Sequence, residues 1–141
     1  MKTSLKGGCA CGAVRYEIRD APTFSLICQC RQCQRITGAG HAAQFAALSE
    51  SLSVRGEIRY YELHADSGNT VSSGFCPVCG CPILKKSTGF PQNVFIHAAT
   101  LDDPSVSSRK CWSGTQAGSP GTMSIQRCHG AEYFSGGSYG V

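Results

Sequence analysis

Cys76-Pro77-Val78-Cys79 is the stretch that decides the fold of this chain. A second pair of closely spaced cysteines, in Cys9-Ala10-Cys11 near the start, could bind the same metal ion. A tetrahedral zinc takes four ligands, and cysteines separated by one or two residues can place both sulfurs ~2.3 Å from one ion. These four thiols therefore predict a closed, structural metal site. Such a site would tie together two segments that lie far apart in the sequence.

A second group of cysteines lies between these segments, in Cys28-Gln29-Cys30-Arg31-Gln32-Cys33. Its three thiols are left over once the first site is complete. Three protein ligands and an open fourth position are typical of a catalytic zinc, whereas four ligands are typical of a structural one. We therefore predict two Zn²⁺ ions per chain, one that holds the fold and one that is available for chemistry.

Disulfide bonds are the alternative use of the ten cysteines. Residues 1–19 contain no apolar core of signal-peptide length, and no stretch approaches the ~18 apolar residues of a membrane span. We therefore expect a cytoplasmic protein without a membrane segment. In a reducing compartment, clustered thiols are more often metal ligands than disulfide partners. Cys111 and Cys128 have no spaced partner, and we expect them to be free thiols.

Length and composition indicate one globular domain. The chain has 141 residues, of which 41% are hydrophobic and 16% are charged, and a usual domain has ~100–150 residues. The net charge of +4 is modest, and the basic residues are spread along the chain. Nucleic-acid binding is therefore not expected. We assign residues 1–141 to a single domain, with the motifs in residues 4–104 and a poorly defined tail at 105–141.

The hydrophobic pattern predicts a mainly β protein. Residues 13–19 alternate polar and apolar side chains with the period of two that marks a half-buried strand. Residues 31–37 could form one helical turn or slightly more, which Gly38 would end. Further strand patterns lie at residues 24–27, 42–48, 52–63, 71–75, 82–86 and 93–98, with a turn or bulge at Gly56-Glu57.

Four motifs occur in order along the chain. They are Gly7-Gly8-Cys9-Ala10-Cys11-Gly12-Ala13-Val14-Arg15-Tyr16, Cys28-x-Cys30-x-x-Cys33-x-Arg35-x-x-Gly38, Gly74-Phe75-Cys76-x-x-Cys79-Gly80 and Thr100-Leu101-Asp102-Asp103-Pro104. Together they resemble the glutathione-dependent formaldehyde-activating enzyme family, which includes centromere protein V. The resemblance spans roughly residues 4–104.

The resemblance implies a zinc-pinned, β-tent-like fold of packed antiparallel sheets with little helix. It also implies that glutathione and formaldehyde combine into S-hydroxymethylglutathione, formally a carbon–sulfur lyase reaction run backwards. Zinc could activate the thiol as its thiolate or polarise the aldehyde oxygen, and both roles remain open. The implied ligands are Cys9, Cys11, Cys76 and Cys79 for the structural zinc and Cys28, Cys30 and Cys33 for the catalytic zinc.

Two positions depart from the family pattern. Gln29 stands where many relatives have histidine, so a titratable group beside the second zinc is not expected there. Cys81 directly follows Gly80 and has two interpretations. It is either a buried small residue or a fourth thiolate for the second zinc, which would close that site and argue against catalysis.

Other polar residues have both a functional and a plain interpretation. Arg31 and Arg35 flank Cys33, where guanidinium groups could bind glutathione carboxylates bidentately or offset the negative charge of a tris-thiolate zinc. His41 could be an acid, a base or a metal ligand, although a surface or hydrogen-bonded histidine is the commoner case. His97 lies on an apparent strand, which favours a partly buried, hydrogen-bonded side chain.

Three classes of function fit these observations. The first is a zinc enzyme that acts on the thiol adduct of formaldehyde or a similar small electrophile. The second is a non-catalytic zinc module that binds a protein or nucleic acid, and the scattered charge weighs against the nucleic-acid version. The third is a reductase of the methionine sulfoxide kind, but Ser113 stands where asparagine should follow Arg109-Lys110-Cys111, which disfavours it. A homodimer through an exposed strand edge is compatible with all three.

Overall fold

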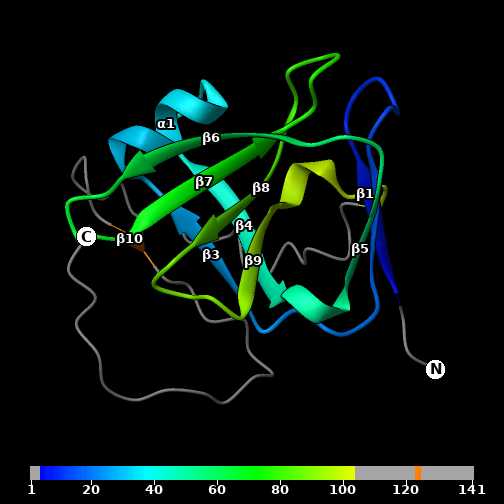
Figure 1. Ribbon diagram of the computed structural model, residues 1–141, viewed down its shortest axis with the longest axis horizontal. Helices are drawn as coiled ribbons and strands as arrows, with labels where there is room; N and C mark the ends of the chain where they lie inside the picture. Colours follow the sequence, from blue (N-terminus) through cyan, green and yellow to red (C-terminus); the bar gives the residue numbers. More distant parts are fainter. Residues whose placement is uncertain (1–3, 104–122, 125–141) are drawn as a thin grey trace.

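The computed structural model describes residues 4–103 and 123–124. Within them the chain forms two antiparallel sheets, one α-helix and two 3₁₀ turns, η1 (Ser49–Ser51) and η2 (Ala98–Thr100) (Figure 1). This architecture confirms the expectation of a mainly β fold of packed antiparallel sheets with little helix.

The smaller sheet has three strands in the order β1-β2-β5. They are β1 (Leu5–Gly8), β2 (Arg15–Ile18) and β5 (Leu52–Arg55). An isolated bridge between Gly7 and Leu101 joins the segment that follows η2 to β1. This sheet therefore gathers three parts of the chain that are distant in sequence.

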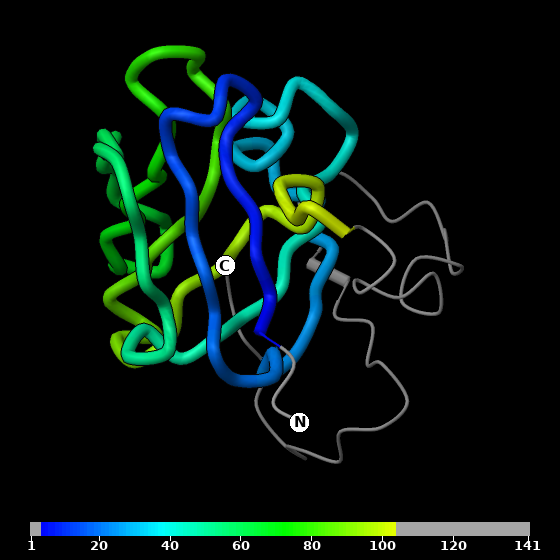
Figure 2. The backbone as a smooth tube through the Cα atoms, turned by 90° about the vertical axis from the view of Figure 1, so that its right-hand side faces the viewer, coloured from blue at the N-terminus to red at the C-terminus, as the bar shows by residue number. Residues whose placement is uncertain are grey.

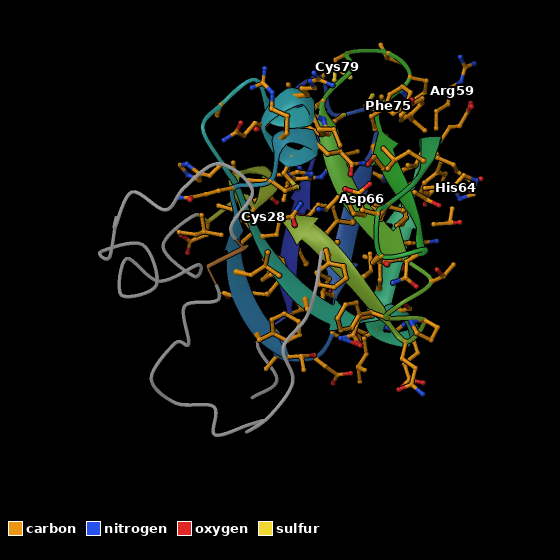
Figure 3. The ribbon with its side chains drawn as sticks, turned by 90° about the vertical axis from the view of Figure 1, so that its left-hand side faces the viewer. Cys28, Arg59, His64, Asp66, Phe75 and Cys79 are labelled. Carbon is orange, nitrogen blue, oxygen red and sulfur yellow. The ribbon has the colours of Figure 1, made fainter. Side chains whose placement is uncertain are left out.

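The larger sheet has seven strands in the order β10-β3-β4-β9-β8-β7-β6. Helix α1 (Arg31–Thr37) connects β3 to β4. Views from opposite sides show the small sheet in front in Figure 2 and α1 in front in Figure 3, so the two cover opposite faces of the large sheet. Its strands are β3 (Phe24–Cys28), β4 (Ala42–Leu48), β6 (Arg59–His64), β7 (Thr70–Phe75), β8 (Pro82–Ser87), β9 (Asn93–His97) and β10 (Met123–Ser124).

The main core lies between the two sheets. Leu84, Ile96 and Phe45 are direct cross-strand partners on β8, β9 and β4, so they share one face of the large sheet. They belong to the same buried cluster as Tyr16 and Ile18 of β2. Buried and half-buried residues alternate along β2, as the sequence pattern predicts.

The other face of the large sheet lies toward α1 and carries a second buried cluster. Phe95 and Ala46 are direct partners on β9 and β4, one residue out of phase with the main core. They belong to one buried cluster with Leu26, Cys28 and Cys33. Because successive side chains of a strand point to opposite faces, the large sheet uses one face for the main core and presents the other to these thiols.

Two segments differ from the sequence-based expectation. Residues 52–63 divide between the sheets, because β5 joins the small sheet and β6 the large one, with Gly56 at φ 97° where the chain crosses. The pattern does not indicate β1, since two of its four residues are glycines, which lower strand propensity. Gly7 is needed there because a Cβ would collide with the Tyr16 hydroxyl and the Thr100 carbonyl.

Some expectations lie outside the described residues. They concern the tail at 105–141 apart from Met123–Ser124, the thiols of Cys111 and Cys128, and the motif Arg109-Lys110-Cys111 with Ser113. The single-domain assignment also stays a prediction. Within the described part of the chain, no helix has the length and apolar character needed to cross a membrane.

Candidate metal centres

Two hairpin loops, one from each sheet, form the first group of thiols. Cys9 and Cys11 lie between β1 and β2, whereas Cys76 and Cys79 lie between β7 and β8. The four sulfurs all lie within 4.8 Å of one another, and the Cys9–Cys11 and Cys11–Cys76 Sγ distances are 3.5 and 3.8 Å. A tetrahedron with ~2.3 Å metal–sulfur bonds has its sulfurs about 3.8 Å apart. The spacing therefore fits a closed four-thiolate metal site.

Both loops curl their backbones around the sulfurs in the same way. The Gly12 N–H donates to the Cys9 carbonyl at 3.2 Å, and the Gly80 N–H donates to the Cys76 carbonyl at 2.9 Å. Gly12 and Gly80 have φ values of 80° and 73°, a left-handed conformation that glycine adopts at little cost. Gly80 therefore lets the backbone turn directly after Cys79.

The pKa values of these thiols indicate what kind of ion the group could bind. Burial opposes ionisation of Cys9, but hydrogen bonds from the Val14 N–H and from the thiols of Cys11 and Cys76 lower its pKa to about 6. At Cys11 a hydrogen bond with the Ala13 backbone favours the thiolate, but the Cys9 thiol, burial and the thiols of Cys79 and Cys76 together outweigh it and raise the pKa to about 12. Crowded thiols cannot all ionise unless a cation lies among them. This donor set suits a divalent metal ion that prefers sulfur.

The second group of thiols lies where β3 passes into α1. Cys28 is the last residue of β3, Cys30 is the N-cap of α1, and Cys33 lies in the first turn (Figure 3 labels Cys28). Their sulfurs lie within 4.8 Å of one another. The Cys33 N–H donates to the Cys30 Sγ at 3.4 Å, so sulfur replaces the oxygen usual at a helix N-cap. The helix that the sequence indicates is therefore what brings the three thiols together.

Negative charge in the second group gathers on Cys30, the partly exposed member. Hydrogen bonds from Cys28 and Cys33 lower the pKa of Cys30 to about 2, and the contact with Cys30 raises the pKa of Cys28. Among the described residues, no fourth His, Cys, Asp or Glu joins this group. A metal held here would have three protein ligands from this part of the chain.

Lys85 is a site residue that the sequence analysis missed. It lies on β8, and its Nζ donates to the Cys33 Sγ at 3.0 Å. Its charge also favours the Cys30 thiolate. The sequence shows Lys85 only as one of many scattered basic residues, and 52 positions separate it from Cys33. No local signal identifies it, because only the strand order brings β8 toward α1.

Cys81 lies beside the first group and does not join the second. It packs against the main core. Burial raises the pKa of its thiol, and the nearby thiols of Cys79, Cys9 and Cys76 also act to raise it. Its Sγ lies 3.7 Å from the Pro82 carbonyl. The structure therefore supports a partly buried small residue and does not support Cys81 as the fourth ligand of the second metal.

The remaining candidates lie around the second group without entering it. Arg31 and Arg35 are exposed on α1, and Arg31 donates to the Gln34 side chain at 3.3 Å. His41 is exposed. His97 is only 5% exposed, and its Nε2 lies 3.4 Å from the Gln44 Nε2. The expected hydrogen-bonded histidine is confirmed at position 97, and Gln44 is a partner that the sequence did not reveal.

Comparisons with known proteins agree with this geometry. The family model of the glutathione-dependent formaldehyde-activating enzyme matches residues 4–114, which include both groups of thiols. The crystal structure of a Rhodobacter sphaeroides protein is 25% identical, with a TM-score of 0.56, and the match covers 69% of this chain and 87% of that one. No curated protein matches the sequence. The chain therefore belongs to the glutathione-dependent formaldehyde-activating enzyme family.

Proposed function

We propose that the protein is a zinc-dependent enzyme that joins glutathione, or another small thiol, to formaldehyde or a similar electrophile. Its product with glutathione and formaldehyde is S-hydroxymethylglutathione, so the reaction is that of a carbon–sulfur lyase in reverse. The observation that carries the proposal is the second group, in which three thiols converge and no fourth protein ligand joins them among the described residues. Family membership supplies the substrate class.

Each group of thiols has its own role in this proposal. Cys9, Cys11, Cys76 and Cys79 would hold a structural zinc, and Cys28, Cys30 and Cys33 would hold a catalytic one. When bound there, zinc supplies Lewis acidity, which stabilises a thiolate or polarises a carbonyl oxygen. Lys85 offsets the negative charge of the thiolates through its contact with Cys33.

The reaction moves one proton and forms one bond. The thiol loses its proton, its sulfur attacks the carbonyl carbon, and the carbonyl π pair moves to the oxygen, which then takes up a proton.

Arg31 and Arg35 are exposed on the helix that carries Cys33. We assign them to the carboxylates of glutathione, because a guanidinium binds a carboxylate through two parallel hydrogen bonds.

Zinc content tests the two sites. Protein purified without added metal is expected to hold two zinc ions per chain, and Cys30→Ser is expected to hold one while keeping its fold. Incubation with millimolar glutathione should remove or exchange only the zinc of the second group. Cys79→Ser is the matched variant for the first group. Two zinc ions in Cys30→Ser would overturn the assignment of Cys30 as a ligand.

Catalysis is tested against the spontaneous reaction of glutathione with formaldehyde. Exchange NMR at equilibrium measures the rate at which S-hydroxymethylglutathione forms and breaks down. The wild-type protein is expected to accelerate this exchange in proportion to its concentration, and Cys30→Ser is expected to lose the acceleration. Equal exchange rates with and without the wild-type protein would overturn the enzyme proposal.

A non-catalytic zinc module for protein interaction is the second candidate. Strand β6 ends the large sheet among the described residues, and Tyr60 and Tyr61 on it are 42% and 63% exposed. An open strand edge with aromatic side chains suits a protein partner, including a second copy of the chain. This candidate predicts that glutathione does not remove the second zinc.

The cytoplasmic location, the homodimer and the absence of nucleic-acid binding stay predictions.

A further inference from the structure

A row of polar side chains crosses the α1 face of the large sheet beside the second group of thiols. Gln44 and His97 are direct partners on β4 and β9, and Ser73 and Lys85 are direct partners on β7 and β8. Lys85 also pairs with Phe95, which lies two residues from His97 and therefore on the same face. We call Ser73, Lys85, His97 and Gln44 the polar row.

The polar row is buried although its members are polar. Gln44 is 2% exposed, His97 5% and Ser73 7%, and Lys85 is partly buried. Protein interiors rarely bury polar groups without hydrogen-bond partners, because an unsatisfied group costs ~1–3 kcal/mol. The location of this row on a face otherwise filled by Leu26, Ala46 and Phe95 therefore requires an explanation.

Contacts place one end of the row at the thiols. Lys85 Nζ donates to the Cys33 Sγ at 3.0 Å. His97 lies near enough to Lys85 for the lysine charge to add to the main effect, burial, and together they lower the pKa of His97 to about 4. His97 is therefore neutral near pH 7, and Gln44 hydrogen-bonds to it at 3.4 Å.

The row also has polar atoms that no described residue satisfies. The Gln44 amide uses one end on His97, and its Oε1 has no partner among the described residues. Amide oxygen and nitrogen are assigned from hydrogen bonds, but either orientation leaves one buried polar end of Gln44 unpaired. The Ser73 hydroxyl is also unpaired in this part of the chain. Within the described residues, no carboxylate forms a salt bridge with Lys85.

We propose that Lys85 and Gln44, with Ser73 next to Lys85, bind the oxygen of the one-carbon group that becomes attached to the substrate thiol. This inference rests on the proposed function and adds the residues that recognise the oxygen. As the carbon–sulfur bond forms, the carbonyl π pair moves to this oxygen. The Lys85 ammonium donates hydrogen bonds to the oxygen and keeps its own proton, and solvent supplies the proton that completes the hydroxyl. That hydroxyl then donates to the Gln44 Oε1, while His97 positions Gln44.

A matched pair of glutathione thioethers tests recognition of the oxygen. S-(2-hydroxyethyl)glutathione and S-propylglutathione have chains of similar length, and only the first ends in a hydroxyl. Isothermal titration of the zinc-loaded full chain should show at least ~10-fold tighter binding of the hydroxyethyl ligand, because a buried hydrogen-bonding site discriminates against a ligand that leaves it unpaired. Equal affinities in the wild-type protein would overturn the inference without any variant. Binding of neither ligand would instead overturn the glutathione part of the proposed function.

Substitutions identify the residues that recognise the ligand hydroxyl. Gln44→Met and Lys85→Met should each reduce the preference for the hydroxyl to below ~3-fold and leave the affinity for S-propylglutathione unchanged. Gln92→Met and Lys86→Met are the matched controls, because both residues are exposed, and they should keep the full preference. Each variant is first shown to retain the zinc content of the wild-type protein. A full preference in both Gln44→Met and Lys85→Met would assign the hydroxyl to another site and overturn the proposal.

Kinetics distinguish oxygen binding from a structural role for Lys85. Because the contact strengthens as charge develops on the oxygen, Lys85→Met should lower kcat at least ~10-fold with little change in the KM for glutathione. Lys85→Arg, which keeps the charge, should recover part of kcat. An unchanged kcat in Lys85→Met, with wild-type acceleration present, would overturn the inference and leave the proposed function intact.

Discussion

At the scale of single residues, identical side chains have different environments that the sequence does not distinguish. Cys81 and Cys79 are two positions apart, yet the sulfur of Cys79 joins the first group and that of Cys81 does not. The backbone N–H of Gly80 bonds to the Cys76 carbonyl, which turns the chain between the two. A cysteine one step beyond this turn packs against the core instead of against the metal site.

Cys81→Ser is therefore expected to leave the zinc content at two ions per chain. The substitution removes no sulfur from either converging group, and Ser should cost only about 1 kcal/mol for a partly buried position. Mass spectrometry under native conditions measures the metal count directly. Cys79→Ser, the matched change in the same loop, should lose one ion. Loss of a zinc ion from the Cys81 variant would show that Cys81 is a ligand after all.

His97 predicts a pH dependence of stability. Its pKa is about 4 in the folded chain against 6.5 for a free side chain, so between these values the unfolded state binds a proton that the folded state does not. The contribution of His97 to folded stability is therefore fully present above pH 6.5 and falls by about 3 kcal/mol as the pH drops to 4. Urea unfolding of the wild type and of His97→Gln across this range isolates the effect, because acid loss of metal is common to both. If the free energy of unfolding depends on pH in the same way in both proteins, His97 has the same pKa in the folded and unfolded states.

At the scale of elements, β1 packs into the fold because the Tyr16 side chain lies close against the backbone of Gly7. Tyr16 on β2 lies across Gly7, and its hydroxyl bonds to the Thr100 hydroxyl at 2.8 Å. Burial raises the pKa of Tyr16 to about 12, so the hydroxyl stays neutral. The glycine that makes β1 a poor strand former in isolation is therefore what allows the small sheet to meet the segment after β9.

Gly7→Ala is expected to destabilise the fold by about 1–3 kcal/mol, the usual range for overpacking. The added methyl would collide with the Tyr16 hydroxyl and the Thr100 carbonyl. Gly40→Ala is the control, because a Cβ there meets nothing within 4 Å, and it should change stability by less than about 0.5 kcal/mol. Chemical denaturation of both variants measures the difference. Equal stability would mean that β1 shifts to accept the methyl group.

At the scale of the whole molecule, the two groups of thiols have different mechanical roles. The first joins the β1–β2 loop of the small sheet to the β7–β8 loop of the large sheet. The second lies within one short segment, β3 and α1. A metal in the first group would therefore link the two layers around the main core, whereas a metal in the second would link only neighbouring parts of the chain.

Loss of the first metal should therefore unfold the protein more readily than loss of the second. Cys76→Ser is expected to cost more than about 4 kcal/mol, as losses of structural metals do. Cys30→Ser removes a metal ligand but keeps a side-chain acceptor at the N-cap of α1, because a serine hydroxyl caps a helix well, so its cost should be smaller. Thermal melts with metal analysis of both variants test this order. A Cys30 variant that melts below the Cys76 variant would contradict the assigned roles.

The sequence by itself determined the local features of this protein. Spacing within a few residues defines the Cys9–Cys11 and Cys76–Cys79 pairs, the second group of thiols, the helix at Arg31–Thr37 and most strands, because these depend on neighbours along the chain. The tertiary structure alone decided that residues 52–63 divide between two sheets. It also brought Lys85 to Cys33 and buried Gln44 beside His97. Those contacts depend on strand order and register, which no pattern confined to one segment encodes.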